Sequence, residues 1–470
     1  MYIDLPAFHS DDTVLNRAAR IATGDIVGNC LPYRAGLLDS EKICVMAGLD
    51  YDTPWTRDAA INVMNAMCIF DREISKSTLL SVCTEAGGRS YIAGQYWDAI
   101  IWAVGAWQYL CVNKDPEFGR FSFDTIGNTL KKMEAEEFDP LVGLFRGGAV
   151  YGDGIAAYPD KYTKTKDHQT GILDWPDANP EARAKKGFGV PLFTLSTNCV
   201  YYAAYRITAA LAGQYNADPA PFTEKAEALK AAINKNFWNE ATGRYDYLFD
   251  DTLRCTHAEA LGLSFAVLFG IANPAQCQSV MRNTPIPSQG IACVWPSFDR
   301  YRIGDHYGRH SGTVWPHAQG FWALACMKAG NYAGFDHEFR SLAEKANRDM
   351  QFVEIYHPDT GLKYGGMQET ADRGIREWKS CDKQTWSATA YWSMILYGLF
   401  GLHFSQSAVT IRPYLPKSIN TMQLKNLKIG QGIYTILVDQ VGDGPDHITL
   451  SKAARGEHII HLRPFYSEKP

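Results

Sequence analysis

The stretch WSATAYWSMILYGLFG, residues 386–401, contains no charged side chain and presents apolar or small groups on every face of a helix. A helix without a polar face is stable only when its neighbours cover it on all sides. Residues 97–112, 196–213, 257–270 and 314–330 have the same largely apolar character. We expect all of these stretches to be inner helices of a large helical domain.

Segments with a single apolar stripe alternate with these apolar stretches. In residues 121–136, for example, Ile126, Leu130 and Met133 recur at steps of four and three, the spacing of one helix face. The two types predict helices in the order outer 11–24, inner 57–70, outer 73–84, inner 97–112, outer 121–136, inner 196–213, outer 221–237, inner 256–270, outer 274–283, inner 314–329, outer 335–348 and inner 386–401. Six outer–inner pairs indicate a mainly α fold with two concentric rings, an (α/α)6 toroid of six helical hairpins.

The connections between these predicted helices are unequal in length. The outer-to-inner connections 137–195, 238–255, 284–313 and 349–385 are long, whereas the inner-to-outer connections are short. Long loops inside a compact domain usually carry function. In the predicted toroid they gather on one face, where the inner helices begin.

A weak repeat lies in three of the long connections. Residues 138–143, 238–243 and 356–361 each begin with an aromatic residue and end with Gly five positions later. A Gly at such a position adopts positive φ without steric cost. We expect each repeat to be a turn that opens a short hairpin.

After residue 404 the pattern changes to alternation of apolar and polar residues. Residues 409–413, 432–438, 447–450 and 458–462 show this period of two, which is typical of strands. The sequence therefore predicts two units: a helical barrel over residues 1–404 and a small β domain over residues 405–470.

The overall composition excludes several classes of protein. The chain has 470 residues, of which 46% are hydrophobic and 21% charged, with a net charge of −5. These values are typical of a globular protein and give no basic excess for nucleic acid. No apolar stretch is long enough to span a membrane, and the N-terminus shows no leader pattern. The 11 Cys form no CxxC pair, which favours buried, reduced thiols in a cytoplasmic protein. We expect no metal and no cofactor, and the oligomeric state stays open.

Polar and aromatic residues concentrate where the predicted inner helices begin. They are Trp55, Arg57, Asp58, Gln95, Trp97, Asp98, Asn198, His257, Trp315, His317, Glu377 and Trp386. Helix capping accounts for some of the Asp and Ser residues there, and Arg57 with Asp58 also fits a structural ion pair. Capping does not account for the Trp residues. Trp beside carboxylates suits a sugar, because the ring stacks on the aromatic face and the hydroxyls take hydrogen bonds.

Hydrolysis of a glycosidic bond needs two carboxyl groups, one protonated and one ionised. Asp153 lies between two Gly residues after the first aromatic–Gly turn, and we predict it to be the general acid; Asp160 is the competing residue. Glu369 follows the third turn at a similar place, and we predict it to be the general base; Glu377 and Asp382 compete for this role.

These motifs resemble those of the six-hairpin, (α/α)6-barrel glycoside hydrolases. The nearest groups are glycoside hydrolase family 63, the trehalases and the α-L-rhamnosidase-like catalytic domains, and the resemblance covers roughly residues 10–415. Gly87-Gly88-Arg89 followed by Tyr96-Trp97-Asp98 is similar to the trehalase signature, although the spacing is longer and its Glu is missing. Glu369 ahead of Trp386-Ser-Ala is similar to the general-base region of family 63, and the loop that holds Asp153 is similar in place to its general-acid region.

Together the residues and the resemblance imply an inverting, exo-acting glycoside hydrolase. Its substrate would be a small saccharide or the non-reducing end of an oligosaccharide. The alternatives are another sugar-active (α/α)6 protein, either a glycoside phosphorylase or an epimerase that uses His257 with His317 or His310, and a non-catalytic saccharide-binding protein. Neither the sugar nor its anomer follows from the sequence.

Overall fold

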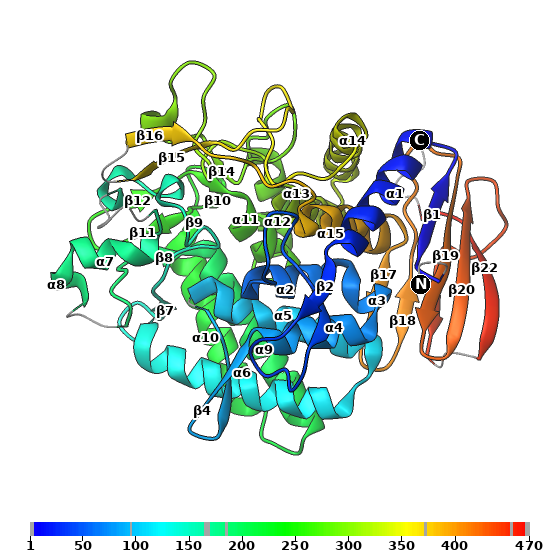
Figure 1. Cartoon of the computed structure of the whole chain (residues 1–470), viewed down its shortest axis with the longest axis horizontal. Coiled ribbons are helices and arrows are strands. Elements are labelled where there is room, and N and C mark those ends of the chain that lie inside the picture. The colour runs from blue at the N-terminus through cyan, green and yellow to red at the C-terminus, as the bar shows by residue number, and fades with distance from the viewer. Residues whose placement is uncertain are drawn as a thin grey trace.

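The computed structural model describes residues 4–94, 96–163, 170–183, 187–370, 374–451 and 455–465. A large helical body occupies most of the molecule, and a β-sheet stands at one end of it (Figure 1). Both marked chain ends lie at this sheet.

The largely apolar stretches form the inner helices. They are α2 (Thr56–Asn62), continued by η1 (Val63–Met67) and α3 (Cys68–Phe70), α5 (Tyr96–Asn113), α9 (Leu195–Gln214), α11 (Ala260–Leu268), α13 (Pro316–Ala329) and α15 (Thr385–Ser393), continued by η6 (Met394–Leu399). In this order each helix packs against the next, and α15 packs against α2, so the series of contacts closes on itself. The approach of α5 to α2 requires Gly105, because an added Cβ would lie 2.8 Å from the Ala60 carbonyl oxygen.

The segments with one apolar stripe form helices that pack against the inner series. They are α1 (Thr13–Gly28), α4 (Arg72–Ser81), α6 (Pro116–Glu137), α10 (Ala220–Phe237), α12 (Pro274–Asn283) and α14 (Tyr332–Asp349). The side chains of Asp12, Asp71 and Asp115 accept hydrogen bonds from the first backbone N–H groups of α1, α4 and α6, which stabilises each helix start. The predicted alternation of buried and amphipathic helices is confirmed.

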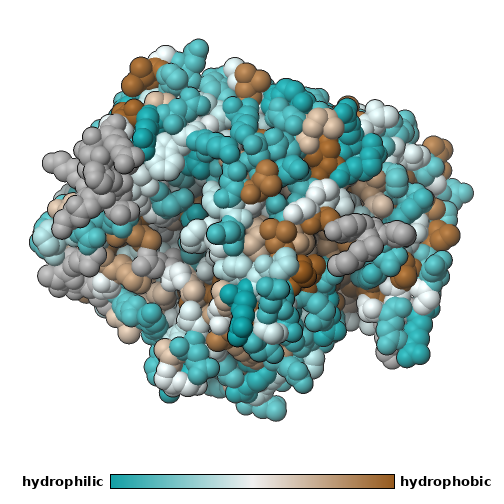
Figure 2. All heavy atoms as spheres, viewed as in Figure 1, coloured by the Kyte–Doolittle hydropathy of each residue, from teal (hydrophilic) through white to brown (hydrophobic). Residues whose placement is uncertain are grey.

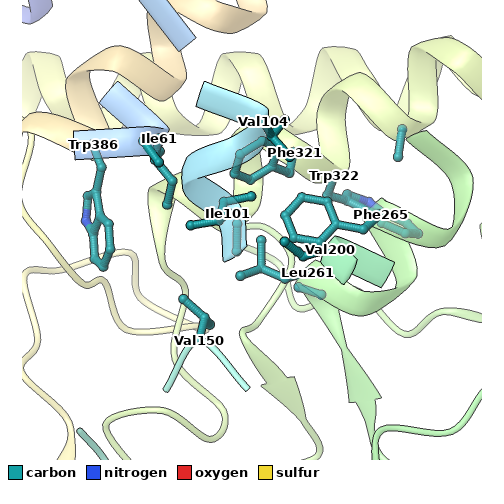
Figure 3. Packing of buried hydrophobic residues seen from close by; sticks show 14 of the residues in the cluster. Ile61, Ile101, Val104, Val150, Val200, Leu261, Phe265, Phe321, Trp322 and Trp386 are labelled. Carbon is teal, nitrogen blue, oxygen red and sulfur yellow. The ribbon is translucent and has the colours of Figure 1, made fainter. Parts of the chain in front are cut away.

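The core lies between the inner helices. Ile61, Ile101, Leu261, Phe265 and Phe321 come from four of the inner helices, α2, α5, α11 and α13, and point toward one another (Figure 3). Each such side chain contributes about 1.5–3 kcal/mol when it is fully removed from water. The inner helices are therefore a packed scaffold that fixes the loops at their ends.

The three aromatic–Gly turns have the predicted geometry. Gly143, Gly243 and Gly361 have φ values of 76°, 63° and 67°. The first two turns join the hairpins β6 (Phe138–Asp139) with β7 (Leu144–Phe145) and β9 (Trp238–Asn239) with β10 (Arg244–Tyr245). In the third, Tyr356 pairs with Lys363 as an isolated bridge.

The remaining connections hold short elements. They are β2 (Cys30–Tyr33), β3 (Lys42–Val45), β4 (Cys83–Ala86), β5 (Arg89–Ile92), η2 (Ile155–Ala157), η3 (Asp160–Tyr162), η4 (Ile172–Asp174), α7 (Trp175–Ala178), α8 (Pro180–Arg183), β8 (Phe193–Thr194), β11 (Leu248–Phe249), β12 (Arg254–Cys255), β13 (Ala258–Glu259), β14 (Val294–Trp295), η5 (Asp299–Tyr301), β15 (Met367–Thr370) and β16 (Gly374–Glu377). Antiparallel pairing joins β15 to β16.

The sheet at the end of the molecule has the strand order β1 (Ala7–Ser10), β19 (Thr421–Ile429), β20 (Gly432–Asp439) and β22 (Gly456–Leu462). A smaller sheet contains β17 (Leu402–Phe404), β18 (Val409–Ile411) and β21 (Ile448–Leu450). The sequence pattern did not predict β19, because a register shift between Leu424 and Leu427 interrupts its alternation.

The predicted domain boundary at residue 404 does not match this sheet. Strand β1 comes from the N-terminal end of the chain and pairs with β19, and the boundary also separates the paired strands β17 and β18. The β unit therefore takes in residues from both ends of the chain.

Polar side chains cover most of the face seen in Figure 2, with apolar residues scattered among them. Among the described residues, no helix has the length and apolar content that crossing a membrane requires. The cytoplasmic location stays a prediction.

Candidate active site

A cavity of about 840 Å³ lies where several inner helices begin. Its lining residues are Tyr51, Trp55, Arg57, Asp58, Asp98, Gly152, Asp153, Thr170, Gly171, Leu173, Asp174, Gly187, Phe188, Glu354, Gln384 and Trp386. Trp55 precedes α2, Asp98 lies in the first turn of α5, and Gln384 precedes α15. Asp153 and Glu354 come from the long connections that were expected to gather on this face.

The backbone is strained beside this cavity. Trp55, Tyr96 and Lys383 have φ values of 46°, 47° and 46°, a region that non-Gly residues rarely adopt. Each lies at or just before the start of an inner helix. Such strain is commonly found at functional sites.

On one side of the cavity, three carboxyl groups surround the side chain of Arg57. Its guanidinium lies 3.6 Å from Asp98 and 3.3 Å from Asp153, and its Nε lies 3.7 Å from Asp58. It also lies over the ring of Trp386, 5.9 Å from the ring centroid. One cation thus holds three carboxyl groups above an aromatic surface.

These three carboxyl groups differ in proton affinity. Burial raises the pKa of Asp58 to about 8 and that of Asp98 to about 6, against the opposing effect of Arg57. The partly enclosed position of Asp153 in the cavity also raises its pKa, but the positive charge of Arg57 outweighs this effect and holds the pKa at about 2. At neutral pH the unliganded site therefore contains an ionised Asp153 beside a largely protonated Asp58.

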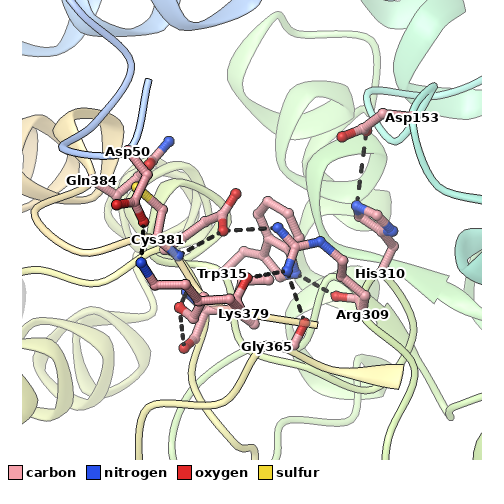
Figure 4. A network of polar contacts seen from close by, with 12 residues as sticks. Asp50, Asp153, Arg309, His310, Trp315, Gly365, Lys379, Cys381 and Gln384 are labelled. Atoms are coloured by element: carbon pink, nitrogen blue, oxygen red, sulfur yellow. Dashed lines mark hydrogen bonds and ion pairs between the residues drawn. The ribbon is translucent and has the colours of Figure 1, made fainter. Parts of the chain in front are cut away.

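A second charged pair lies on the cavity wall. Arg309 Nη2 donates to Glu354 Oε2 at 2.8 Å, and the backbone N–H of Cys381 donates to the same oxygen at 3.1 Å. Arg309 Nη1 also donates to the carbonyl oxygens of Gly365 and Lys379 (Figure 4). Glu354 Oε1 receives a single 3.4 Å contact within the described residues, from Tyr51.

Sequence reasoning missed Glu354. The signal was present, because Glu354 is the one charged residue in the run Phe352-Val-Glu-Ile-Tyr356. A carboxylate in a buried apolar run must be paired or functional. Its exposed fraction is only 4%.

Aromatic rings form a cluster beneath Trp386. The His317 ring stacks on Trp386 with centroids 4.1 Å apart, and His310 stacks on Trp315 at 5.0 Å. Burial lowers the pKa of both His residues to about 3, so both rings are neutral. Within the described residues none of their ring nitrogens has a hydrogen-bond partner, and the same holds for Trp386 Nε1. Trp386 lines the cavity, whereas the predicted binding residues Trp315 and His317, and also His310, pack against one another outside this lining.

His310 also approaches Asp153. Its Nε2 lies 3.8 Å from Asp153 Oδ1 (Figure 4). Gly154 makes room for the ring, because an added Cβ there would overlap it. Asp153 itself is open to the cavity, with 54% of its side chain exposed.

The other acidic candidates lie away from the cavity lining. Glu369 is 16% exposed and accepts from Arg300 Nε at 2.9 Å and from the Tyr301 hydroxyl at 2.8 Å. Asp160 is 81% exposed and pairs with Arg300 at 2.6 Å. Asp382 pairs with Lys363, and Glu377 lies exposed on β16.

Several predicted binding residues are occupied elsewhere. Trp97 is buried in the core and stacks on Phe265 at 6.1 Å. The Asn198 amide bonds to the backbone of Phe145 and Thr194, so its polar atoms tie a loop to α9. His257 stacks on Phe298.

None of these three residues lines the cavity, and we do not retain them in the proposed site. All three predictions relied on nearness to the start of an inner helix, and such a position does not by itself make a side chain face the cavity. Gln95 lies outside the described residues.

Solved structures resemble this fold at low sequence identity. A sialidase matches with a TM-score of 0.70 at 12% identity, over 95% of this chain and 40% of its own. The rhamnosidase of family GH78 from Bacillus sp. GL1 matches with a TM-score of 0.63 at 14% identity, over 100% of this chain and 44% of its own. The chain thus spans less than half the length of these two proteins.

A third structure is closer in length. The GH63 mannosylglycerate hydrolase from Thermus thermophilus, in complex with glucose, matches with a TM-score of 0.58 at 14% identity, over 80% of this chain and 99% of its own. No curated protein sequence matches the chain.

The family model of the mannosylglycerate hydrolase MGH1-like glycoside hydrolase domain matches residues 97–387. This segment includes Asp98, Asp153, Glu354 and Trp386 of the cavity. The resemblance to family 63 and to the rhamnosidase-like domains is thereby confirmed. The chain belongs to the MGH1-like glycoside hydrolases.

Proposed function

We propose that this protein is an inverting, exo-acting glycoside hydrolase built on an (α/α)6 toroid, with Asp153 as general acid and Glu354 as general base. The observation that carries the proposal is that both carboxyl groups line one cavity, together with Trp386. Glu354 replaces Glu369 in the proposed mechanism, because Glu369 is bonded to Arg300 and Tyr301 away from this cavity.

The proposed acid must carry a proton when the glycosidic bond breaks. In the unliganded site Arg57 keeps Asp153 ionised, while burial acts in the opposite direction. When a sugar hydroxyl replaces Asp153 as the partner of Arg57, the effect that lowers the pKa of Asp153 is weakened. The enclosed surroundings, which raise this pKa, remain. Binding of substrate therefore supplies the protonated form of Asp153.

The proposed base is suited to activate water. Arg309 and the Cys381 N–H hold Glu354 through Oε2, which fixes the orientation of the carboxylate. Oε1 is then the oxygen that accepts a proton from water as the water attacks the anomeric carbon. In an inverting enzyme this attack comes from the face opposite the leaving group.

The remaining cavity residues bind the sugar in this proposal. Trp386 and Trp55 offer aromatic faces, and Arg57, Asp58 and Asp98 take hydroxyl groups. Trp315 and His317 lie outside the cavity lining and pack against Trp386, which supports the position of its ring. A cavity of about 840 Å³ has the size of a small-molecule site, which supports action on a small saccharide.

The test is sugar release from a panel of disaccharides and aryl glycosides that includes mannosyl and glucosyl compounds. We expect the wild type to release one sugar, and Asp153→Asn and Glu354→Gln to lose at least ~10²-fold in kcat. Proton NMR of the first product should show the anomer opposite to that of the substrate. Retention would contradict the inverting mechanism, and turnover that requires phosphate would indicate a phosphorylase. No release with or without phosphate would contradict the hydrolase proposal.

A further inference from the structure

Strand β15 lies outside the cavity lining but contacts the supports of both proposed catalytic carboxyl groups. On one side its first residue bonds to the segment that carries Arg309. The backbone N–H of Arg309 donates to the Met367 carbonyl at 2.7 Å, and the Met367 N–H donates to Tyr307 at 2.8 Å. Arg309 in turn holds Glu354, so β15 supports the proposed base through one intermediate residue.

On its other side β15 holds the segment that follows Asp153. Gln368 Oε1 accepts from the Ala156 N–H at 3.1 Å. Glu369 holds Arg300, whose Nη2 donates to the carbonyl oxygens of Ile155 at 2.9 Å and Tyr158 at 2.5 Å. Two neighbouring side chains of one strand thus fix the turn directly after the proposed acid.

The charge of Glu369 is essential to this arrangement. Arg300 is 12% exposed, and it pairs with Glu369, which is 16% exposed, and with Asp160, which is 81% exposed. The pair with Asp160 is open to solvent and therefore weak. Neutralising Glu369 leaves Asp160 as the only carboxylate paired with Arg300 among the described residues. The Arg300 side chain is then held less firmly against the carbonyl oxygens of Ile155 and Tyr158.

We infer that β15 is a positioning strand that sets the placement of Asp153 relative to Glu354, and that Glu369 is a positioning residue acting through Arg300 on Asp153. This inference rests on the proposed function. It assigns to Glu369 a role that touches neither the sugar nor the attacking water.

The test uses leaving groups that differ in their need for a proton. Phenoxide leaves a phenyl glycoside poorly without protonation. Fluoride leaves a glycosyl fluoride without it, as the C–F bond breaks, water adds to the anomeric carbon and its proton passes to the base. The sugar is the one identified in the panel above. A variant with impaired general-acid function should therefore hydrolyse the phenyl glycoside more slowly than the wild type and the glycosyl fluoride at an unchanged rate.

We expect Glu369→Gln to lower kcat for the phenyl glycoside by about 10–100-fold and for the fluoride by less than about threefold, within the range of general-acid effects. Arg300→Lys should show the same selectivity. Asp153→Asn should show it more strongly, and Glu354→Gln should lose both activities. Glu85→Gln, an exposed carboxyl on β4, is the matched control and should change neither rate.

Three outcomes would overturn the inference. Equal loss on both substrates by Glu369→Gln would place this residue in the base function or in general stability, and thermal melting separates these two. Wild-type rates on both substrates would show that the contact has no role. If the wild type hydrolyses neither substrate, the proposed hydrolase function is contradicted, and the inference that rests on it is contradicted with it. If Asp153→Asn is selective and Glu369→Gln is not, only the inference fails.

Discussion

Glu354 and Glu369 each form an ion pair with an arginine, but they differ in their position relative to the cavity. Glu354 pairs with Arg309 at 2.8 Å and Glu369 pairs with Arg300 at 2.9 Å. Glu354 lines the cavity, whereas Glu369 does not. A third carboxyl group, that of Glu259, is fully buried and forms no ion pair with a described arginine or lysine.

The difference between these glutamates shows what determines their roles. An arginine partner fixes the position of each of the two carboxyl groups, but the proposed catalytic role also needs a face toward the cavity. Without a cation, burial raises the pKa of Glu259 to about 8. Pairing with a cation and access to the cavity are thus separate properties of these carboxyl groups.

The largest expected effect is on turnover. Glu354→Gln should lower kcat by about 10³-fold or more, because the amide cannot accept the proton of the attacking water. Glu369→Gln should lose about 100-fold at most on the same aryl glycoside. The measurement is kcat for both variants beside the wild type. A larger loss for Glu369→Gln would reverse the comparison and return the base function to β15.

The next effect is on stability. Arg309→Met leaves Glu354 buried without its cation and should cost about 3–5 kcal/mol in the free energy of unfolding. Arg300→Met should cost less, because Glu369 is more exposed than Glu354. Urea denaturation of the two variants checks this order. Equal costs would mean that the two pairs are equally desolvated.

The pH dependence of stability tests the third glutamate. Glu259 is protonated in the folded state up to about pH 8, whereas in the unfolded chain it ionises above about pH 4.3. Unfolding therefore releases a proton between these values, and the contribution of Glu259 to stability falls by about 1.4 kcal/mol per pH unit as the pH rises.

Glu259→Gln removes this dependence. The variant should match the wild type near pH 4.5 and exceed it in stability near pH 8, measured from denaturation midpoints. A wild-type slope in the variant would contradict the raised pKa.

The smallest effect concerns a single hydroxyl group. Tyr301→Phe removes the 2.8 Å bond to Glu369 and should cost about 1 kcal/mol in the free energy of unfolding. Tyr307→Phe removes a 2.7 Å bond to Asp359 near the surface and should cost about half as much. Equal values from thermal melting would show that solvent screens both carboxylates alike.

The helices could be predicted from the sequence because the inner helices contain few charged residues and the outer helices have one apolar stripe. Residues 386–401 contain no charge, and their helix is covered on all sides as expected. The face that carries the cavity also followed from the unequal connections. Strand β19 could not be predicted, since its register shift breaks the alternation on which the prediction depends.

The site was predicted only in part, because a sequence gives position along a helix but not the direction of a side chain in the assembled fold. Asp98 faces the cavity, whereas its neighbour Trp97 packs in the core. Glu369 and Glu354 both follow the same outer helix, but Glu369 lies on β15 outside the cavity lining and Glu354 lies in a loop that reaches it. The isolated charge within an apolar run points to the glutamate that lines the cavity.

Strand β1 has a consequence for how the protein is made. Its Phe8 pairs with Leu424, so this strand leaves the ribosome long before the strand with which it pairs. Contacts so distant in sequence form slowly, and an exposed strand that waits for its partner is open to wrong pairing. During synthesis the helical body can fold while this strand remains unpaired, and the sheet can close only after β19 and β20 have emerged.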